Sequence, residues 1–218
     1  MTQGFAYVFV VIIGYLFGSI PAGYLAGKIR GIDIRTVGSG NIGTTNTFRV
    51  LGKKAGIAVL IVDTIKGFIP AFWLPHFGLL IVRDTTSTSG ALSFHFAMLA
   101  GLASILGHVY PCWLHFRGGK GIATTGGVYA ALAPIPVALT LALWLIIFIS
   151  SGYVSLASIA AAVGLPFFVW FMGCHPILVG LTIVIGLLAL YKHRSNAQRL
   201  LNGTEHRFNL FRRKKESL

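Results

Sequence analysis

Long apolar runs separated by short polar segments dominate the chain. Seven such runs can be delimited, at residues 5–27, 56–82, 91–110, 121–134, 136–150, 154–173 and 176–191. About 20 consecutive apolar residues cross a bilayer as an α-helix, whereas a β-barrel would show shorter segments of alternating hydrophobicity. The pattern therefore predicts an all-α integral membrane protein, with seven transmembrane helices in one domain, residues 1–218. Pro134 and Pro136 divide the short fourth and fifth runs, which indicates tilted or partial crossings.

The composition excludes an ordinary soluble domain. Hydrophobic residues make up 55% of the chain and charged residues 11%, whereas soluble proteins carry about 25% charged residues. Only Met-Thr-Gln-Gly precedes the first run. That start lacks the basic segment of a signal peptide, so we expect the first run to be a retained span.

The Lys and Arg residues predict the orientation. Of the 18, Arg83 lies on one side of the seven-span arrangement, Lys66 lies within the second run, and the other 16 lie on the opposite side, in the segments 28–55, 111–120 and 192–218. Basic loops remain in the cytoplasm. We therefore expect the N-terminus outside and the C-terminus, with its basic tail 207–218, in the cytoplasm. The net charge of +13 then faces anionic lipid or anionic substrates rather than nucleic acid.

Few residues are available for metal or disulfide chemistry. Cys112 and Cys174 would lie at opposite faces of the membrane and cannot pair. The five acidic residues form no cluster that would hold Mg²⁺: Asp33, Asp63, Asp84, Glu205 and Glu216. We expect no metal and no cofactor. Asp63 and Lys66 are three residues apart inside the second run, where charges are costly, so we expect them to pair as structural residues.

The first polar segment with unusual chemistry is "RTVGSGNIGTTNTFRVLGKKAG", residues 35–56. Its glycines, hydroxyls and amides could not face lipid unless they lined a cavity. Hydroxyl and N–H groups followed by an arginine suit a phosphate, because a guanidinium binds phosphate through two parallel hydrogen bonds. An ordinary polar loop is the alternative.

The second segment, residues 107–126, contains "GHVYPCWLHFRGGKG". Successive glycine N–H groups can form an anion-binding concavity, and Arg117 and Lys120 add positive charge. A helix that starts near Gly121 would add its N-terminal dipole. The segment is not a Walker A loop, because Leu114 and Gly121 stand where that motif requires Gly and Ser or Thr. A flexible connection whose cations fix orientation is the alternative.

The third segment is "KHRSNAQRLLNGTEHR", residues 192–207. His193, Asn196 and Arg199 recur every three residues and are expected to share one helical face. Asn202-Gly203 is a turn signal that ends this helix. A basic helix lying on the cytoplasmic leaflet is the alternative.

Together the three segments resemble the cytoplasmic motifs of the bacterial acyl-phosphate-dependent glycerol-3-phosphate acyltransferases. "GSGNIGTTN", "FRGGKG" and "HRSNAQRLLNGTE" occur in the family's order and on one predicted face, and the resemblance extends from about Gly14 through Glu205. Two departures are a threonine at Thr44, where many members have alanine, and a lengthened outer loop at residues 83–94.

The resemblance implies a reaction and its setting. An acyl chain would pass from acyl phosphate to the 1-hydroxyl of glycerol 3-phosphate, giving lysophosphatidic acid and inorganic phosphate in the first step of membrane phospholipid synthesis. It also implies a multi-pass protein of the bacterial inner membrane with its site on the cytoplasmic face, and a functional link to a soluble acyl-phosphate synthase.

The resemblance also assigns roles to residues at matching positions. The implied catalytic residues are Ser39, Lys120, His193 and Asn196. The implied substrate- and phosphate-binding residues are Asn41, Thr45, Arg49, Gly118, Gly119, Lys120 and Ser158, and Glu205 is implied to be structural. His193 could act as a general base, since its pKa suits proton transfer near neutral pH, or could only bind substrate. We prefer the second role, because the oxygens of acyl phosphate could accept the proton.

Other functions find less support in the residues. No histidine has an aspartate five residues later, which the His-x4-Asp motif of acyl-CoA-dependent acyltransferases requires, and the Pro-Ser-Gly-His motif of lipid phosphatases is absent. An organic-phosphate or anion transporter is the alternative outside enzymes, since broken helices with cations also hold anions in transporters. Against it, nearly all polar motifs lie on one predicted face.

Overall fold

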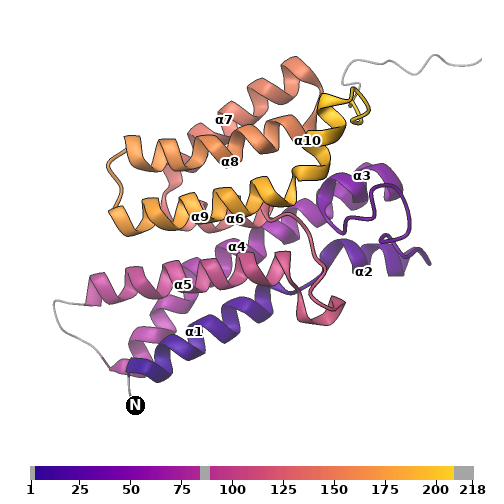
Figure 1. Cartoon of the computed structure of the whole chain (residues 1–218). Helices are drawn as coiled ribbons and strands as arrows, with labels where there is room; N and C mark the ends of the chain where they lie inside the picture. The colour runs from indigo at the N-terminus through magenta and orange to yellow at the C-terminus, as the bar shows by residue number, and fades with distance from the viewer. Residues whose placement is uncertain (1–2, 84–88, 209–218) are drawn as a thin grey trace, which may run out of the picture. The chain divides into compact units, whose positions relative to one another are not determined.

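The computed structural model describes residues 3–83 and 89–208, and the regular elements in these ranges are helices, as the sequence predicts (Figure 1). They belong to two compact units, Met1–Pro134 and Ile135–Leu218, and each unit is considered by itself. The basic tail from residue 209 and the part of the lengthened loop at 84–88 lie outside the described residues.

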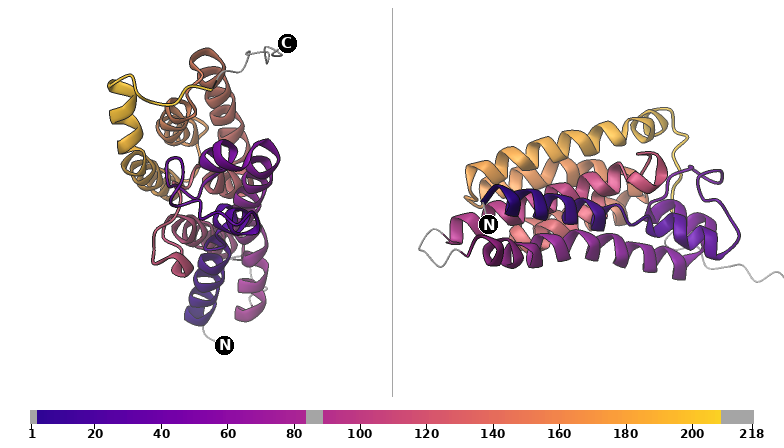
Figure 2. Two further views of the ribbon diagram at one scale, coloured as in Figure 1. Left: turned by 90° about the vertical axis from the view of Figure 1, so that its right-hand side faces the viewer. Right: turned by 90° about the horizontal axis from the view of Figure 1, so that it is seen from below.

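The first unit is built from three long helices and the shorter α6, with further short helices at one end. α1 (Gln3–Gly18), α4 (Lys53–Val82), α5 (Ser89–Val109) and α6 (Ile122–Leu132) pack against one another. α2 (Ala22–Ile29) and α3 (Thr44–Leu51) lie together beside the first part of α4 (Figure 2). A 3₁₀ helix, η1 (Cys112–Leu114), follows α5.

The second unit consists of α7 (Pro134–Ser151), which begins at the boundary, α8 (Val154–Phe171), α9 (Pro176–Lys192) and α10 (Arg194–Leu201). α8 and α9 pack together, and α10 contacts both. His175 caps α9, because its Nδ1 accepts a hydrogen bond of 3.3 Å from the backbone N–H of Ile177. This cap role was not predicted from the sequence.

The helix lengths support a membrane protein with five spans, or six if α9 and α10, which meet at a bend of 56°, count as one. The predicted fourth run, 121–134, yields only the 11-residue α6. At 1.5 Å per residue α6 is about 16 Å long, roughly half the hydrocarbon thickness. It ends ahead of Pro134, as expected when a proline blocks helical continuation. Seven spans and the orientation of the termini remain predictions.

The first predicted run, 5–27, is not one continuous helix. α1 ends at Gly18, and α2 begins only at Ala22. Pro21 lacks an N–H, and its ring disfavours helical backbone at the preceding Ile20. The Ile20 carbonyl instead accepts a 2.8 Å hydrogen bond from the Lys66 ammonium of α4. The proline signal was in the sequence, but the long apolar run masked it.

Segment 28–55, predicted as a loop, contains the whole of α3 and the last residues of α2. α3 has the apolar residues Phe48 and Val50 between polar ones, and its Asn46 and Thr47 are buried. A helix of only eight residues leaves too short a pattern to be recognised by periodicity. The first motif is therefore half loop and half helix.

Glycines let the main helices of the first unit approach closely. A Cβ on Gly14 or Gly18 of α1 would collide with the backbone of Ala100 or Ser104 in α5. A Cβ on Gly67 of α4 would collide with the backbone of Thr124 in α6. Small residues spaced by four are how helices pack in lipid, where no hydrophobic effect drives them together.

Adjacent glycines in α6 provide a direct test of this packing. A Cβ on Gly127 would overlap the Thr64 carbonyl of α4, whereas a Cβ on Gly126 would meet no atom within 4 Å. We expect Gly127→Ala to destabilise the protein by roughly 1–3 kcal/mol through overpacking. Gly126→Ala should be neutral or stabilising by up to about 1 kcal/mol, because alanine favours the helix. Thermal unfolding of the detergent-solubilised protein measures both, and equal losses would contradict the packing.

Candidate active site

The loop between α2 and α3 is organised by Asn46. Its side chain is buried in α3, and its Nδ2 donates to the carbonyls of Ile34 at 3.2 Å and Val37 at 3.1 Å. Its Oδ1 accepts from the N–H of Ser39 at 2.9 Å. Gly38 lies beside it in the left-handed region at φ 66°. One buried amide thus fixes the backbone from Ile34 to Ser39, whose side chain is exposed.

The remaining first-motif residues lie at α3 itself. Gly43 is its N-cap, and Oδ1 of Asn41 accepts a 2.8 Å hydrogen bond from the Gly43 N–H. Thr45 lies in the first turn and Arg49 in the last, and both are half-buried. The first N–H groups of a helix have no partner within it and carry partial positive charge. The segment therefore joins a helix N-terminus to a cation.

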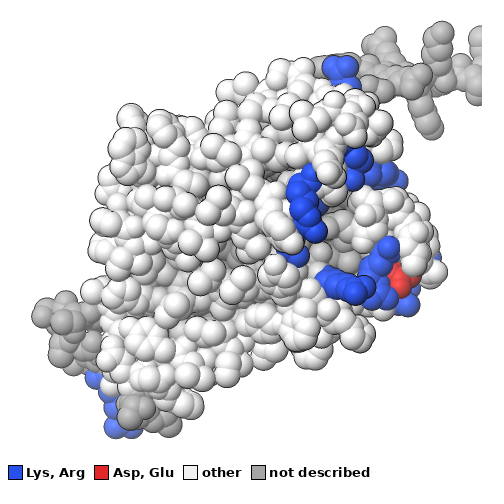
Figure 3. Space-filling model, viewed as in Figure 1, with Lys and Arg blue, Asp and Glu red and all other residues white. Residues whose placement is uncertain are grey.

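Arg35, at the start of this motif, is part of an exposed ion pair. Its Nη2 lies 2.7 Å from Oδ2 of Asp33, and its guanidinium stacks 4.8 Å from the centre of the Tyr24 ring. The hydrogen bonds from Arg35 lower the pKa of the Asp33 carboxyl to about 2. On the face in Figure 3, Lys and Arg surfaces gather at the end where α2 and the α2–α3 loop lie, with acidic surface among them.

The second motif folds back onto the end of α5. The N–H of Gly118 donates to the carbonyl of Val109 at 3.2 Å, and the N–H of Gly119 donates to that of His108 at 3.0 Å. These two N–H groups are engaged by the carbonyls at the helix end, so they do not form the anion-binding concavity predicted from the glycines. Lys120 comes directly before Gly121, the N-cap of α6, which starts at Ile122.

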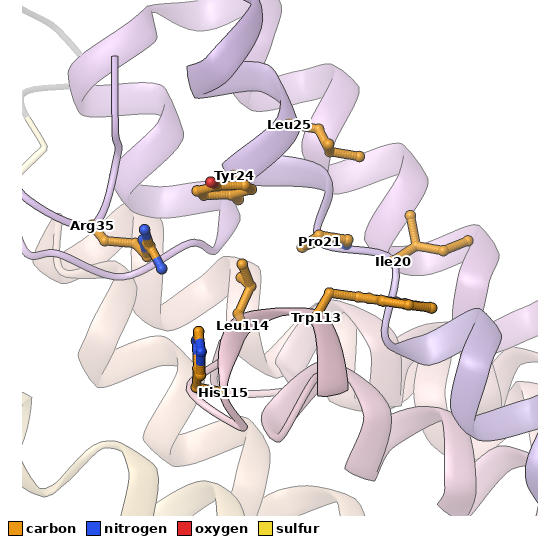
Figure 4. Close-up of a pocket in the computed structure, with 8 residues that line it drawn as sticks. All are labelled: Ile20, Pro21, Tyr24, Leu25, Arg35, Trp113, Leu114 and His115. Carbon is orange, nitrogen blue, oxygen red and sulfur yellow. The ribbon is translucent and has the colours of Figure 1, made fainter.

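The first and second motifs meet within the first unit. Ile34, Ile42 and Leu114 form a small buried core between the α2–α3 loop and η1. A mostly apolar pocket of about 460 Å³ lies beside this contact. Figure 4 shows its lining, which combines the α1–α2 break, Arg35 and the η1 region: Ile20, Pro21, Tyr24, Leu25, Arg35, Trp113, Leu114 and His115.

The third motif belongs to the second unit. The Asn196 Nδ2 donates to Oε1 of Glu205 at 2.9 Å, and the Arg199 Nε donates to Oε2 at 2.7 Å. Burial alone would raise the pKa of the Glu205 carboxyl, but the hydrogen bonds from Asn196 and Arg199 hold it below its ordinary value. Asn196 and Arg199 do share a face, as predicted, and Glu205 ties the turn after α10 to it.

His193 departs from the predicted arrangement. It lies at the bend between α9 and α10 rather than within the second helix, and its Nδ1 is 2.8 Å from the Ala189 carbonyl of α9. A carbonyl only accepts, so Nδ1 carries the proton and Nε2 is the acceptor in the neutral ring. Ser158, also in this unit, is buried in α8 and accepts a 3.3 Å hydrogen bond from the Trp144 indole.

Asn46 is the residue that sequence reasoning did not single out. It stands between Thr45 and Thr47 in a polar stretch, and this local pattern does not predict burial. Among residues 3–83 and 89–208, no group of three or more His, Cys, Asp or Glu side chains could hold a metal ion.

Comparison with known proteins points to one family. A family model described as glycerol-3-phosphate acyltransferase matches residues 8–203. The chain is 45% identical over 201 residues to a glycerol-3-phosphate acyltransferase of Aquifex aeolicus, covering 92% of this chain and 98% of that one. It is 47% identical over 194 residues to one of Geobacter metallireducens, covering 89% and 93%.

Solved structures agree with the sequence relatives. The fold is similar to crystal structures of PlsY (YgiH), an integral membrane glycerol 3-phosphate acyltransferase. The glycerol 3-phosphate form has a TM-score of 0.81 and 43% identity, covering 93% of this chain and 95% of that chain. The lysophosphatidic acid form has a TM-score of 0.79 and 42% identity, with the same coverage.

Replacing the Asn46 amide should loosen the first motif. Asn46→Ala leaves the Ile34 and Val37 carbonyls and the Ser39 N–H without this partner, so we expect a loss of about 2 kcal/mol in unfolding free energy. Thr36→Val, which removes an exposed 2.9 Å bond to the Asp33 carbonyl, is the control and should cost less than about 0.5 kcal/mol. Thermal unfolding in detergent compares them, and equal effects would show that Asn46 does not organise the loop.

The lowered pKa of Glu205 predicts an acid-dependent loss of stability. A carboxyl whose folded pKa is depressed stabilises the protein above its unfolded pKa, about 4.3, and this contribution disappears as pH falls through the folded value. Wild type should therefore exceed Glu205→Gln in melting temperature at pH 7, and the difference should shrink as pH falls below 4. Asp33→Asn, which alters an exposed pair, should change stability little at pH 7. A difference that stays constant with pH would refute the Glu205 assignment.

Proposed function

The chain belongs to the glycerol-3-phosphate acyltransferase family, and on that basis we propose that it transfers an acyl chain from acyl phosphate to the 1-hydroxyl of glycerol 3-phosphate. The products are lysophosphatidic acid and inorganic phosphate. The observation that carries the proposal is 43% identity, over 93% of this chain, to a membrane acyltransferase solved in its glycerol 3-phosphate form. Both motifs of the first unit are compatible with anionic substrates.

The groups in the first unit that are suited to bind phosphate are the side chains of Arg49 and Lys120 and the N-termini of helices α3 and α6. A guanidinium and an ammonium suit the phosphates of the two substrates. Ser39, held in place through the Asn46 amide, presents an exposed hydroxyl. Positive groups placed before reaction also stabilise the oxyanion that forms at the acyl carbonyl. Asn41 and Thr45 extend the same polar surface at the start of α3, and Gly118 and Gly119 set the backbone ahead of Lys120.

The choice of acyl phosphate as the proposed donor is supported by its chemistry. An acyl phosphate is an activated mixed anhydride whose leaving group, phosphate, is stabilised by cations, so the enzyme mainly has to align the reactants. The glycerol hydroxyl oxygen forms a bond to the acyl carbon, the bond from that carbon to the phosphate oxygen breaks, and the hydroxyl proton leaves on phosphate. The chain also lacks the His-x4-Asp motif of acyl-CoA-dependent enzymes.

The second unit contributes His193, Asn196 and Ser158 to the proposal. The Nδ1 proton of His193 is directed to the Ala189 carbonyl. In the neutral ring Nε2 is then the acceptor nitrogen, which suits either binding of a substrate hydroxyl or a role as general base. We retain the substrate-binding role, with phosphate oxygens as the proton acceptor. Asn196 already binds Glu205 through Nδ2.

The proposal includes topology and partners. We propose seven spans with the N-terminus outside, the three motifs at the cytoplasmic face of a bacterial inner membrane, and supply of the donor by a soluble acyl-phosphate synthase. The short α6 would then cross only part of the membrane or meet the bilayer at an angle. Arg83, the C-cap of α4, would lie on the outer side.

The reaction should be tested on purified protein with acyl phosphate, acyl-CoA and acyl-carrier protein as separate donors and EDTA present. We expect lysophosphatidic acid from acyl phosphate only. Lys120→Ala and Arg49→Ala should each lower the rate by about 100-fold or more, as loss of a transition-state contact does. Arg83→Ala removes a cation from the other end of α4 and should leave the rate within about twofold, because it is remote from the motifs.

Two results would overturn the proposal. The first is no product from any donor in folded protein, in which case uptake of labelled glycerol 3-phosphate into proteoliposomes without donor would identify a transporter. The second is an equal loss of rate in Arg83→Ala and Lys120→Ala. That result would show that the motif residues do not form the active site.

A further inference from the structure

Three ionisable side chains are buried together behind the second motif. Asp63 and Lys66 of α4 are 2% and 3% exposed, and His108 of α5 is 4% exposed. The proposed chemistry uses none of them. Charges inside membrane helices are costly and therefore mark a pairing or a function.

Lys66 neutralises Asp63 and ties it to the helix break. Its Nζ lies 2.8 Å from Oδ1 of Asp63, which confirms the predicted pair, and 2.8 Å from the Ile20 carbonyl. The Ser104 hydroxyl donates to the Lys66 carbonyl at 2.7 Å, which links α5 to the same turn of α4. The ammonium is thus fixed to α1 through the Ile20 carbonyl, whereas Ser104 bonds only the backbone of this turn.

His108 approaches the same carboxylate from α5. Its Nδ1 lies 3.5 Å from Oδ1 of Asp63, a separation that suits an electrostatic contact rather than a short hydrogen bond. Since a carboxylate only accepts, this contact favours a proton on Nδ1. The ring is therefore oriented by Asp63, and Asp63 is held by Lys66.

The other edge of the imidazole lies against the second motif. A Cβ on Gly119 would collide with the Nε2 edge of His108, so the ring lies directly against the Gly119 backbone. The Gly119 N–H also donates to the His108 carbonyl at 3.0 Å. Both the ring and the backbone of one residue thus support the peptide immediately before Lys120.

We propose that His108 is a positioning residue for the acyl transfer, with Asp63 and Lys66 as its anchor. Because Asp63 holds the ring at its Nδ1 edge, the opposite edge supports Gly118–Lys120 at a fixed distance from α4, and Lys120 and the N-terminus of α6 keep one orientation toward the substrate phosphate. A ring of the same size without this anchor would not be held against Gly119. α6 is itself fixed to α4 at Gly67, where a Cβ would collide with the Thr124 carbonyl. The loop is then held at both ends by α4. The catalytic part of this inference rests on the proposed function.

The chain provides matched variants for the test. His108→Phe keeps a ring of similar size but removes both nitrogens, and His108→Asn keeps an N–H donor near the Nδ1 position. Ser104→Ala is the control, because it removes a buried bond to Lys66 one turn earlier on α5 and leaves the second motif untouched. Melting temperatures of all three variants establish that the compared proteins are folded.

Kinetics and the two cysteines give independent readings. Misplacement of reacting groups by about 1 Å can cost 10²-fold, so we expect His108→Phe to lower kcat per folded protein on the order of 10- to 100-fold. His108→Asn should recover part of the loss, and Ser104→Ala should stay within about threefold of wild type.

Cys112, in η1 ahead of the loop, and Cys174, in the second unit, are both partly exposed. A thiol reagent should modify Cys112 severalfold faster in His108→Phe and Cys174 at an unchanged rate.

Each contrary result has one meaning. If His108→Phe matches Ser104→Ala in kcat, or if Asn fails to recover more activity than Phe, His108 does not position the reacting groups. If both cysteines react faster together, the substitution loosens the whole protein and the positioning role is wrong. If wild type itself is inactive with every donor, the proposed function fails, while the Cys112 rate still decides whether His108 holds the loop.

Discussion

The ammonium group of Lys66 is the contact on which the first unit depends. In lipid every polar group needs a partner within the protein, and a proline break in α1–α2 removes helical donors from the carbonyls ahead of it. Lys66 supplies a donor to Ile20 and at the same time neutralises Asp63. The helix break and the buried charge are therefore satisfied as one group, and the His108 imidazole lies beside it. Removing one partner of such a group would leave the others unpaired in an apolar setting, which is the costly case.

Close helix packing makes that arrangement possible. α4 runs against α1, α5 and α6, and glycines at the α1–α5 and α4–α6 contacts bring backbones together. The backbone geometry of the second motif follows from this, since its glycine N–H groups satisfy carbonyls at the end of α5. Glycines that the sequence suggested as a ligand-binding loop thus serve helix termination and close packing.

The sequence predicts what depends on composition and on short spacing. Four features could be predicted because each depends on composition or on neighbouring residues: the membrane class, the three polar segments, the Asp63–Lys66 pair and the end of α10 at Asn202-Gly203. Features that depend on partners distant in the sequence could not be predicted. The break at Ile20 needs Lys66 from α4, the burial of Asn46 needs the α2–α3 loop to fold over it, and the engagement of Gly118 and Gly119 needs the end of α5. The bend at His193 escaped notice because a helical spacing pattern continues through it.

The pairing of the described carboxylates bears on where the proton of the proposed reaction goes. Within the described residues Asp33 binds Arg35, Asp63 binds Lys66, and Glu205 binds Arg199. Each acid is matched to a cation two, three or six residues away, so none of the three offers an unpaired carboxylate as a base. Under the proposed reaction, that leaves an imidazole or the donor's own phosphate as acceptor, and phosphate becomes more basic as the bond to the acyl carbon breaks.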